Sequence, residues 1–305
     1  MPPKVRNFNK VVIWGLKKRF HTHRYIFQGY YDTLVKTGVP VILVEDEARN
    51  RGCVEKNDLI ISADVSGKMI PVRNNISEYA LPVRDDVYYC LHNFDPKFTG
   101  QIRPDRLLNL QVYVRHAEEF EKISEAVYYD DKTRTLFQPW GTNLLPSEFK
   151  KPLFSKSKFV FWIGSIWNNA AGQGNFGEIE ILKRALAKRD LHFLNLRFMP
   201  ERANTTLIRC SRLAPAVAGK YQASIDYLPC RMFKNISYGQ LGFSNVKKFD
   251  EIFVGCNIYD QNIENMVGKV LSLSRGEYLE IVRQQQEICK KYTYVQHLNN
   301  IFSHL

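Results

Sequence analysis

The sequence predicts an α/β protein of two domains, each with a mainly parallel sheet covered by helices. Three observations lead to this fold class. A chain of 305 residues is longer than one hydrophobic core usually organises. Short apolar runs alternate with helical segments along most of the chain. A stretch dense in turn formers, Gln-Pro-Trp-Gly-Thr-Asn-Leu-Leu-Pro at residues 138–146, interrupts this alternation as an interdomain linker would.

The first predicted domain spans residues 1–143. Its opening strand, residues 11–14, leads through a loop into a helix near residues 24–37, where apolar side chains recur at helical spacing and Gly38 ends the pattern. Further strands are expected at residues 39–44, 59–63, 87–91, 110–114 and 126–129. Strands that alternate with helices in this way are typical of a parallel sheet.

The second predicted domain spans residues 144–305, and the alternation restarts in it. We expect strands at residues 159–163, 192–197 and 224–228 and helices at residues 176–189, 205–221 and 229–238. Residues from Glu277 to the end keep helical period, and this terminal helix is a candidate to pack back on the first domain. Two open α/β domains that meet at a linker place a ligand cleft between the carboxyl ends of their sheets.

Positive charge is concentrated in the second half of the chain. The net charge is +12; residues 1–150 carry 22 Lys and Arg against 19 Asp and Glu, whereas residues 151–305 carry 21 against 12. The second half therefore suits an anionic ligand, such as a phosphate, a nucleic acid or a membrane surface, although a basic surface also serves solubility alone.

Several features favour a cytoplasmic location. The six cysteines are scattered and have no histidine at metal-ligand spacing, which is typical of free thiols in a reducing compartment. The N-terminus has no apolar signal core, and no apolar run is long enough to span a membrane. The sequon at Asn235 lies inside a predicted helix. We expect a protein without a transmembrane segment.

The helix predicted at residues 229–238 carries the most distinctive local pattern. Pro229 and Gly239 suit its two ends. One stripe is apolar, and the opposite stripe presents two cations and two hydrogen-bonding groups close to a helix N-terminus. Such a face suits the diphosphate of a leaving group, or is simply a solvated surface. The residues of this second stripe are Arg231, Lys234, Asn235 and Tyr238.

The segment Pro-Cys-Arg-Met-Phe-Lys-Asn-Ile-Ser-Tyr-Gly at residues 229–239 resembles the donor-site segment of GT-B glycosyltransferases. Arg231, Phe233 and Gly239 match that family's Arg-x-Phe-x-x-x-x-x-Gly pattern. The linker resembles the family's interdomain crossing, and His-Thr-His-Arg-Tyr-Ile at residues 21–26 resembles some bacterial and algal-virus members.

The resemblance implies two Rossmann-like domains that face each other across a cleft. It implies a nucleotide-sugar donor, UDP- or GDP-linked, as co-substrate, a glycan or other hydroxyl acceptor, and no additional cofactor. Many retaining members carry a glutamate in this helix, where the present chain has Lys234 or Asn235. The stereochemical outcome therefore stays open.

A glycine-rich loop follows the strand at residues 159–163. Gly172, Gly174 and Gly177 formally match the G-x-G-x-x-G pattern of dinucleotide sites. About eight residues separate these glycines from the strand, whereas a dinucleotide site places them directly after it, which disfavours a nicotinamide cofactor. A glycine loop before a helix can still approach a phosphate or a sugar. The expected donor set is completed by Gly164 and Ser165, which open the loop, and by Arg197, which ends the next strand.

Transfer to a hydroxyl needs a group that removes the acceptor proton, and histidine suits this role near neutral pH. His21 and His23 lie in the loop that leads into the first helix, at the carboxyl edge of the first sheet. The predicted catalytic set is His23, His21 and Asp46, with Asp64 and Asp95 as further candidates to orient or replace the histidine.

No Asp-x-Asp metal motif occurs, so we expect metal-independent transfer in which cationic side chains stabilise the leaving diphosphate. Two alternatives remain from the sequence alone. One is a Rossmann-type enzyme that uses NADP or another nucleotide cofactor, and the other is a basic nucleic-acid-binding protein. The favoured partners are a nucleotide-sugar donor and a glycan acceptor, without nucleic acid.

Overall fold

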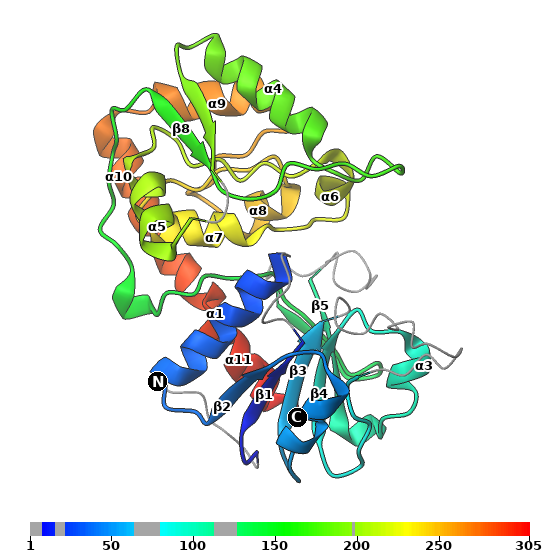
Figure 1. Cartoon of the computed structure of the whole chain (residues 1–305). Helices are drawn as coiled ribbons and strands as arrows, with labels where there is room; N and C mark the ends of the chain where they lie inside the picture. Colours follow the sequence, from blue (N-terminus) through cyan, green and yellow to red (C-terminus); the bar gives the residue numbers. More distant parts are fainter. Residues whose placement is uncertain (1–7, 16–21, 64–79, 113–126, 197–198) are drawn as a thin grey trace. The chain divides into compact units, whose positions relative to one another are not determined.

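The computed structural model describes residues 8–15, 22–63, 80–112, 127–196 and 199–305, and the chain divides into two compact units (Figure 1). Unit 1 combines the described residues up to Gln111 with Val127–Gln138 and Tyr294–Leu305. Unit 2 contains Val112 and Pro139–Thr293. Both units combine parallel strands with helices, so the predicted α/β fold class is confirmed.

Unit 1 is organised by a seven-stranded sheet in the order β2-β1-β3-β4-β5-β7-β6. Every neighbouring pair of strands is parallel except β6 and β7, which run antiparallel. Most of the strands are continuous apolar runs, as expected where both faces of a parallel sheet are covered. Their bounds are β1 Val11–Trp14, β2 Val41–Val44, β3 Leu59–Ala63, β4 Tyr88–His92, β5 Leu107–Gln111, β6 Tyr128–Asp130 and β7 Thr135–Phe137.

Two helices from opposite ends of the chain lie side by side in unit 1 (Figure 1). Helix α1 (Thr22–Lys36) contacts the C-terminal helix α11 (Tyr294–Ser303), and the rings of Tyr30 and Tyr294 meet edge to face at 4.9 Å. The C-terminal segment therefore completes the core of unit 1. The shorter helices of this unit are η1 Ala48–Cys53, α3 Pro96–Thr99 and η2 Pro104–Arg106.

Unit 2 has a parallel pair of strands, β8 (Phe159–Trp162) and β9 (His192–Asn195), which irregular chain extends into a wider layer. The buried segment 211–219 follows the free side of β8, and residues 242–245 follow that segment in turn. The layer is held by bonds from Arg212 N to Phe159 O at 2.8 Å, from Phe161 N to Ser211 Oγ at 2.8 Å, from Ala216 N to Phe243 O at 3.2 Å and from Ser244 N to Ile258 O at 3.2 Å.

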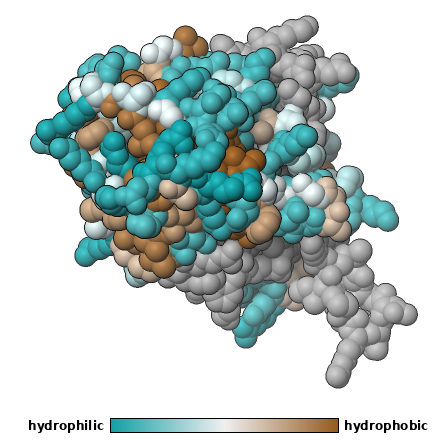
Figure 2. Space-filling model, turned by 90° about the horizontal axis from the view of Figure 1, so that it is seen from above, coloured by the Kyte–Doolittle hydropathy of each residue, from teal (hydrophilic) through white to brown (hydrophobic). Residues whose placement is uncertain are grey.

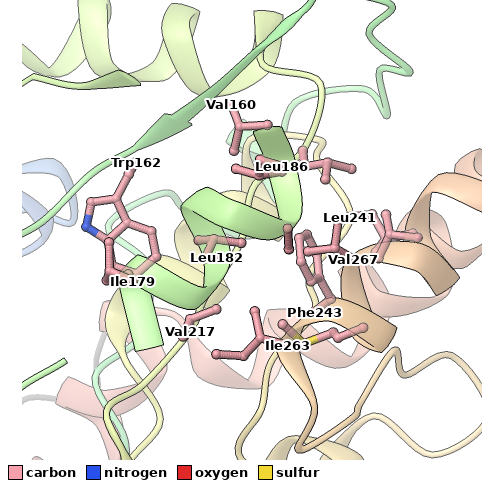
Figure 3. Packing of buried hydrophobic residues seen from close by; sticks show 14 of the residues in the cluster. Val160, Trp162, Ile179, Leu182, Leu186, Val217, Leu241, Phe243, Ile263 and Val267 are labelled. Atoms are coloured by element: carbon pink, nitrogen blue, oxygen red, sulfur yellow. The ribbon is translucent and has the colours of Figure 1, made fainter. Parts of the chain in front are cut away.

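Helices surround this layer and close a hydrophobic core, shown in Figure 3. The core joins β8 to α4 and α9, and Trp162 lies at one edge of it beside Ile179. The helices and turns of unit 2 are η5 Pro146–Glu148, α4 Phe176–Ala187, α5 Glu201–Cys210, α6 Lys220–Ser224, α7 Cys230–Ser237, α8 Lys247–Ile252, α9 Ile263–Ser272, α10 Arg275–Cys289 and η6 Lys290–Tyr292.

Two glutamines of α10 hold the loops of unit 2. Gln285 is fully buried; its Nε2 donates to the carbonyl oxygens of Gly242 and Cys256, both at 2.8 Å, and its Oε1 accepts from Gly242 N at 2.8 Å. Gln286 Nε2 donates to the carbonyl oxygens of Lys150 and Ile236 at 2.9 and 3.0 Å. Through these bonds α10 holds the loops at Lys150, Gly242 and Cys256 and the C-terminal turn of α7.

One stretch of unit 2 differs from the prediction. The strand expected at residues 224–228 is wrong, because α6 ends at Ser224 and irregular chain follows it. The helix expected at residues 205–221 is also wrong in extent: α5 ends at Cys210, and residues 211–219 are irregular and mostly buried. The start of this segment is bonded to β8, and Pro215 within it disfavours a helix.

One face of the described surface is mainly polar. Figure 2 shows hydrophilic residues over most of the visible face, with hydrophobic residues in separate patches. Among the described residues, no helix combines the length and apolarity needed to cross a membrane.

Candidate functional site

Helix α7 folds as the amphipathic helix that the sequence predicts. Pro229 is its N-cap, and Gly239, with a φ of +85°, follows its C-cap. Met232, Phe233 and Ile236 are fully buried, whereas Arg231 and Lys234 remain partly exposed. The apolar stripe thus anchors the helix in unit 2 and leaves the two cations at the boundary with solvent.

Asn235 and Tyr238 do not share this exposure, which corrects the interpretation of the polar stripe. Asn235 is buried, and its Nδ2 donates to the carbonyl oxygen of Ala214 at 2.8 Å. The Tyr238 hydroxyl is bonded to Glu201 Oε1 and lies 3.2 Å from Asn143 Oδ1. Burial, followed by the charge of Glu201, raises the pKa of Tyr238 well above its ordinary value. Protein groups therefore engage both side chains, and their role in binding a ligand stays a prediction.

The Arg231 side chain reaches the carboxyl end of β8. The Cζ atom of its guanidinium lies 3.9 Å from the centroid of the Trp162 ring, and its Nη1 donates to the carbonyl oxygen of Ile163 at 3.3 Å. Trp162 ends β8 and is buried, so its position is set by the core of unit 2. The sheet thus presents an aromatic face and a carbonyl group to one arginine.

Gly164 leaves the space that Arg231 occupies. Its φ is +126°, a conformation that residues with a side chain rarely adopt. A Cβ atom at this position would lie 3.2 Å from Arg231 Nη1. Gly164 and Ser165 are both exposed, so the predicted pair lies at the open end of β8 next to Arg231.

Arg231 forms no ion pair with any carboxylate of the described residues. Its Nε and Nη2 atoms have no protein partner there, and neither is among the buried atoms that lack one, so both reach solvent. Desolvation by the surrounding protein lowers the pKa of the guanidinium, which nevertheless stays charged at neutral pH. The Nε–Nη2 edge is the part of a guanidinium that can bind two oxygens of a phosphate or carboxylate at once.

The loop between β8 and α4 is held in one shape by its asparagines. Asn175 Oδ1 accepts from Trp167 N at 3.0 Å and its Nδ2 donates to the Ser165 carbonyl oxygen at 3.1 Å. Asn168 Oδ1 accepts from Gly174 N at 3.1 Å. A Cβ atom on Gly174 would lie 1.9 Å from the Trp167 carbonyl oxygen, so only glycine fits there. Gly174 therefore serves the packing of this ordered loop, whereas a Cβ atom on Gly172 or Gly177 would meet nothing within 4 Å.

The catalytic residues predicted in unit 1 are only partly described. Asp46, which follows β2, is buried and accepts a hydrogen bond from Trp14 Nε1 at 2.8 Å. His23 lies in the first turn of α1. Asp95 is the N-cap of α3 and accepts from Lys97 N at 2.8 Å. His21, Asp64 and Arg197 lie outside the described residues.

One histidine of unit 1 was missed by the sequence analysis. His92 is the last residue of β4 and is buried; its Nδ1 lies 2.9 Å from the Leu110 carbonyl oxygen. A carbonyl oxygen only accepts, so Nδ1 carries the proton and Nε2 presents a lone pair, 3.2 Å from Asn93 Nδ2. A histidine at the carboxyl end of an apolar strand was the available signal. His92 is thus a further candidate base.

Among the described residues, no group of three or more histidine, cysteine, aspartate or glutamate side chains is arranged to hold a metal ion. Lys234 has no ion-pair partner among the described residues, and it lies about one helical turn from Arg231. The charge available to an anion at α7 therefore comes from these two cations.

No protein-family model matches the chain, and no curated protein matches it in sequence. Among solved structures, it is similar to a UDP-forming α,α-trehalose-phosphate synthase from Burkholderia vietnamiensis, with a TM-score of 0.49 and 10% identity over 93% of this chain and 80% of that chain. It is also similar to an E. coli structure described as trehalose-6-phosphate bound with UDP-2-fluoro glucose, with a TM-score of 0.47 and 12% identity over 93% and 78%. A third similar structure is the N-terminal domain of a Candida albicans trehalose-6-phosphate phosphatase, with a TM-score of 0.45 and 9% identity over 93% and 76%. At this level of similarity, the function has to be argued from the residues of the chain itself.

Proposed function

We propose that the chain is a glycosyltransferase of the GT-B type that moves a sugar from a nucleoside diphosphate to a hydroxyl of a glycan or another acceptor. The observation that carries this proposal is the open Nε–Nη2 edge of Arg231, which lies at the carboxyl end of β8 and has no carboxylate partner among the described residues. Ligands of α/β proteins bind at that end of the strands. A doubly charged diphosphate fits an unpaired guanidinium edge.

The chemistry needs the charge that Arg231 supplies. The bond between the anomeric carbon and the diphosphate oxygen breaks, a bond from that carbon to the acceptor oxygen forms, and the acceptor loses its proton. Negative charge then grows on the leaving diphosphate. A preorganised cation stabilises that charge, and the protein around Arg231 removes part of the water from its guanidinium, which lowers its pKa. Lys234 adds a second positive charge on the same helix. In this proposal the transfer is independent of a metal ion.

The acceptor proton goes to a base from unit 1. His23 and His21 are the favoured candidates, and Asp46 orients the histidine or takes its place. Asp46 accepts from Trp14 Nε1 and is buried, which suits an orienting role better than direct proton transfer. His92, with its Nε2 lone pair, joins Asp64 and Asp95 as the next candidates.

All six cysteines are unpaired in the structure, which supports a reducing compartment, and the proposal includes a cytoplasmic location. The donor in this proposal is linked to UDP or GDP.

Calorimetry and thermal unfolding with a panel of UDP, GDP, ADP and dTDP test the donor class, in the presence of EDTA. A nucleoside diphosphate at 100 times its dissociation constant should stabilise the folded chain by roughly 2.7 kcal/mol. Stabilisation by NADP with none by the four diphosphates would contradict the proposal and favour a nicotinamide enzyme.

A further inference from the structure

We infer that Trp162 is a positioning residue that holds the Arg231 guanidinium in place for the donor diphosphate. This inference rests on the function proposed above. It adds that an aromatic ring contacts the arginine of the site, whereas a carboxylate usually pairs with a buried arginine.

The contacts of Arg231 determine the orientation of its guanidinium plane. The Cζ atom of the guanidinium lies over the Trp162 ring, 3.9 Å from its centroid. The bond from Nη1 to the Ile163 carbonyl oxygen is 3.3 Å long and restrains the same group from a second side. Together, the ring contact and the hydrogen bond restrict the guanidinium and leave the Nε–Nη2 edge as the part that no described protein group engages. A fixed edge loses less rotamer freedom when a ligand binds than a free side chain does.

Gly164 has no side chain and so leaves room for the Arg231 guanidinium. A Cβ atom there would stand 3.2 Å from Nη1 and would press the guanidinium away from the Ile163 carbonyl oxygen. The φ of +126° also favours glycine at this position. Trp162, Ile163 and Gly164 are consecutive: the first two contact Arg231, and the third leaves room for its guanidinium.

The indole of Trp162 is unfavourable at a core position because its N–H group has no hydrogen-bond partner among the described residues. Its side chain is buried. Trp14 shows the usual arrangement, because its Nε1 donates to Asp46 at 2.8 Å. An unbonded buried donor destabilises the fold, a cost that an apolar side chain at this position would avoid. Tryptophan, however, offers the strongest aromatic face for a cation.

A double-mutant cycle on pyrophosphate binding tests the inference. Calorimetry would compare the parent chain, Trp162→Leu, Arg231→Ala and the double variant, with inorganic pyrophosphate as the probe. We expect W162L alone to weaken binding about two- to thirtyfold, the range of a cation–π contact. In the R231A background the same replacement should have no effect, because the side chain it positions is gone.

The outcomes separate the two proposals. If W162L and R231A weaken binding independently, so that their effects multiply, Trp162 acts only through the fold; the positioning role is then wrong and the donor site stands. If the parent chain binds neither pyrophosphate nor a nucleoside diphosphate, the proposed function itself fails. Trp140→Phe removes another buried tryptophan of unit 2 and is the matched control, which should bind as the parent does.

Fluorescence provides a second measurement should W162L fail to fold. Trp162→Phe keeps an aromatic ring under Arg231. Pyrophosphate should change the tryptophan emission of the parent chain. The same change should occur in Trp167→Phe, the control that removes the exposed indole of the nearby loop. The change should be absent in W162F while calorimetry still detects binding. An unchanged response in W162F would contradict contact between Trp162 and the ligand-bound arginine.

Discussion

Arg84 in unit 1 and Arg231 in unit 2 use the same chemical group in opposite ways. Arg84 donates from Nε and Nη2 to the two carboxylate oxygens of Asp86, each at 2.8 Å. Arg231 has no carboxylate on that edge among the described residues, although it is packed against the Trp162 ring. An uncompensated cation in a crowded setting costs free energy, and folded proteins usually pair such a group. In the function proposed above, a ligand supplies the anionic partner that Arg231 lacks among the described residues.

The pKa shifts of the two arginines have opposite directions. The hydrogen bond that Arg84 donates to Asp86 is the main cause that raises the pKa of Arg84, whereas desolvation lowers the pKa of Arg231. His297 in α11 gives a third case. It is buried without a described partner for either ring nitrogen, and burial lowers its pKa to about 3. Histidine can thus escape an unfavourable burial by staying neutral, but arginine cannot.

The largest expected effect separates the roles of the two units. If a histidine of unit 1 takes the acceptor proton, His23→Ala should lower turnover by on the order of a hundredfold or more, with little change in nucleotide affinity. Steady-state kinetics and calorimetry on one preparation would measure both. Full turnover in both H23A and H21A would exclude these two histidines, and Asp46, Asp64, Asp95 and His92 would be replaced next.

The second effect concerns the open edge of Arg231. Arg231→Ala should weaken binding of the nucleoside diphosphate by roughly tenfold to over a hundredfold, because a charge-assisted contact of about 1.5–3 kcal/mol is lost. Calorimetry measures the affinity, and a melting curve verifies that the variant is folded. A folded R231A that binds as tightly as the parent chain would place the donor site elsewhere.

Arg231→Lys sharpens the comparison with Arg84. Lysine keeps the charge and loses the planar edge that two oxygens can share. We expect R231K to recover only part of the affinity lost in R231A, measured in the same calorimetric series. Full recovery would show that charge alone binds the anion and that the edge geometry is unimportant.

The third effect is a dependence of stability on pH that originates in His297. Its pKa is about 3 in the folded chain and has an ordinary value of 6.5 when unfolded. The unfolded chain therefore binds the proton first, so the stabilisation is complete above about pH 6.5 and is lost as the pH falls toward 3. One proton contributes at most roughly 1.4 kcal/mol per pH unit.

Urea unfolding of the parent chain and His297→Leu at pH 7, 6 and 5 would measure this slope. The variant should show a flatter dependence on pH. His304, whose pKa burial also lowers, acts in the same direction, and His304→Gln is the matched control for its share. An identical slope in the parent chain and H297L would exclude His297 as the source.

The smallest expected effect concerns Arg84, the arginine that is paired with a carboxylate. The side chains of Arg84 and Asp86 are both about one-third exposed or more, at 36% and 40%, so solvent screens their pair. Asp86→Asn should shift the melting temperature by no more than about 2 °C and leave nucleotide affinity unchanged. A loss of nucleotide binding in D86N would mean that the two arginines are not independent, and the contrast between them would fail.

Local patterns in the sequence were sufficient to predict the class of fold and the helix α7 that carries Arg231 and Lys234. The apolar runs of β1, β3, β4 and β8 and the two faces of α7 depend on residues close together in the chain, so their periodicity predicts them. The prediction failed at residues 211–228, where a buried, irregular segment begins with a hydrogen bond to β8. The two bonded residues, Ser211 and Phe161, are 50 positions apart in the sequence. Propensity does not contain that pairing.

The sequence by itself determined that Arg231 and Lys234 share a helix face and that Gly164 opens the loop after β8. Only the tertiary structure decided that Trp162 lies against Arg231, that Asn235 and Tyr238 are buried, and that His92 donates from Nδ1. Helical spacing says which residues lie on one side of a helix, but the partner of each side comes from strands and loops brought together by the core. Burial and charge compensation are properties of that assembled environment, and they decide which arginine stays open to a ligand.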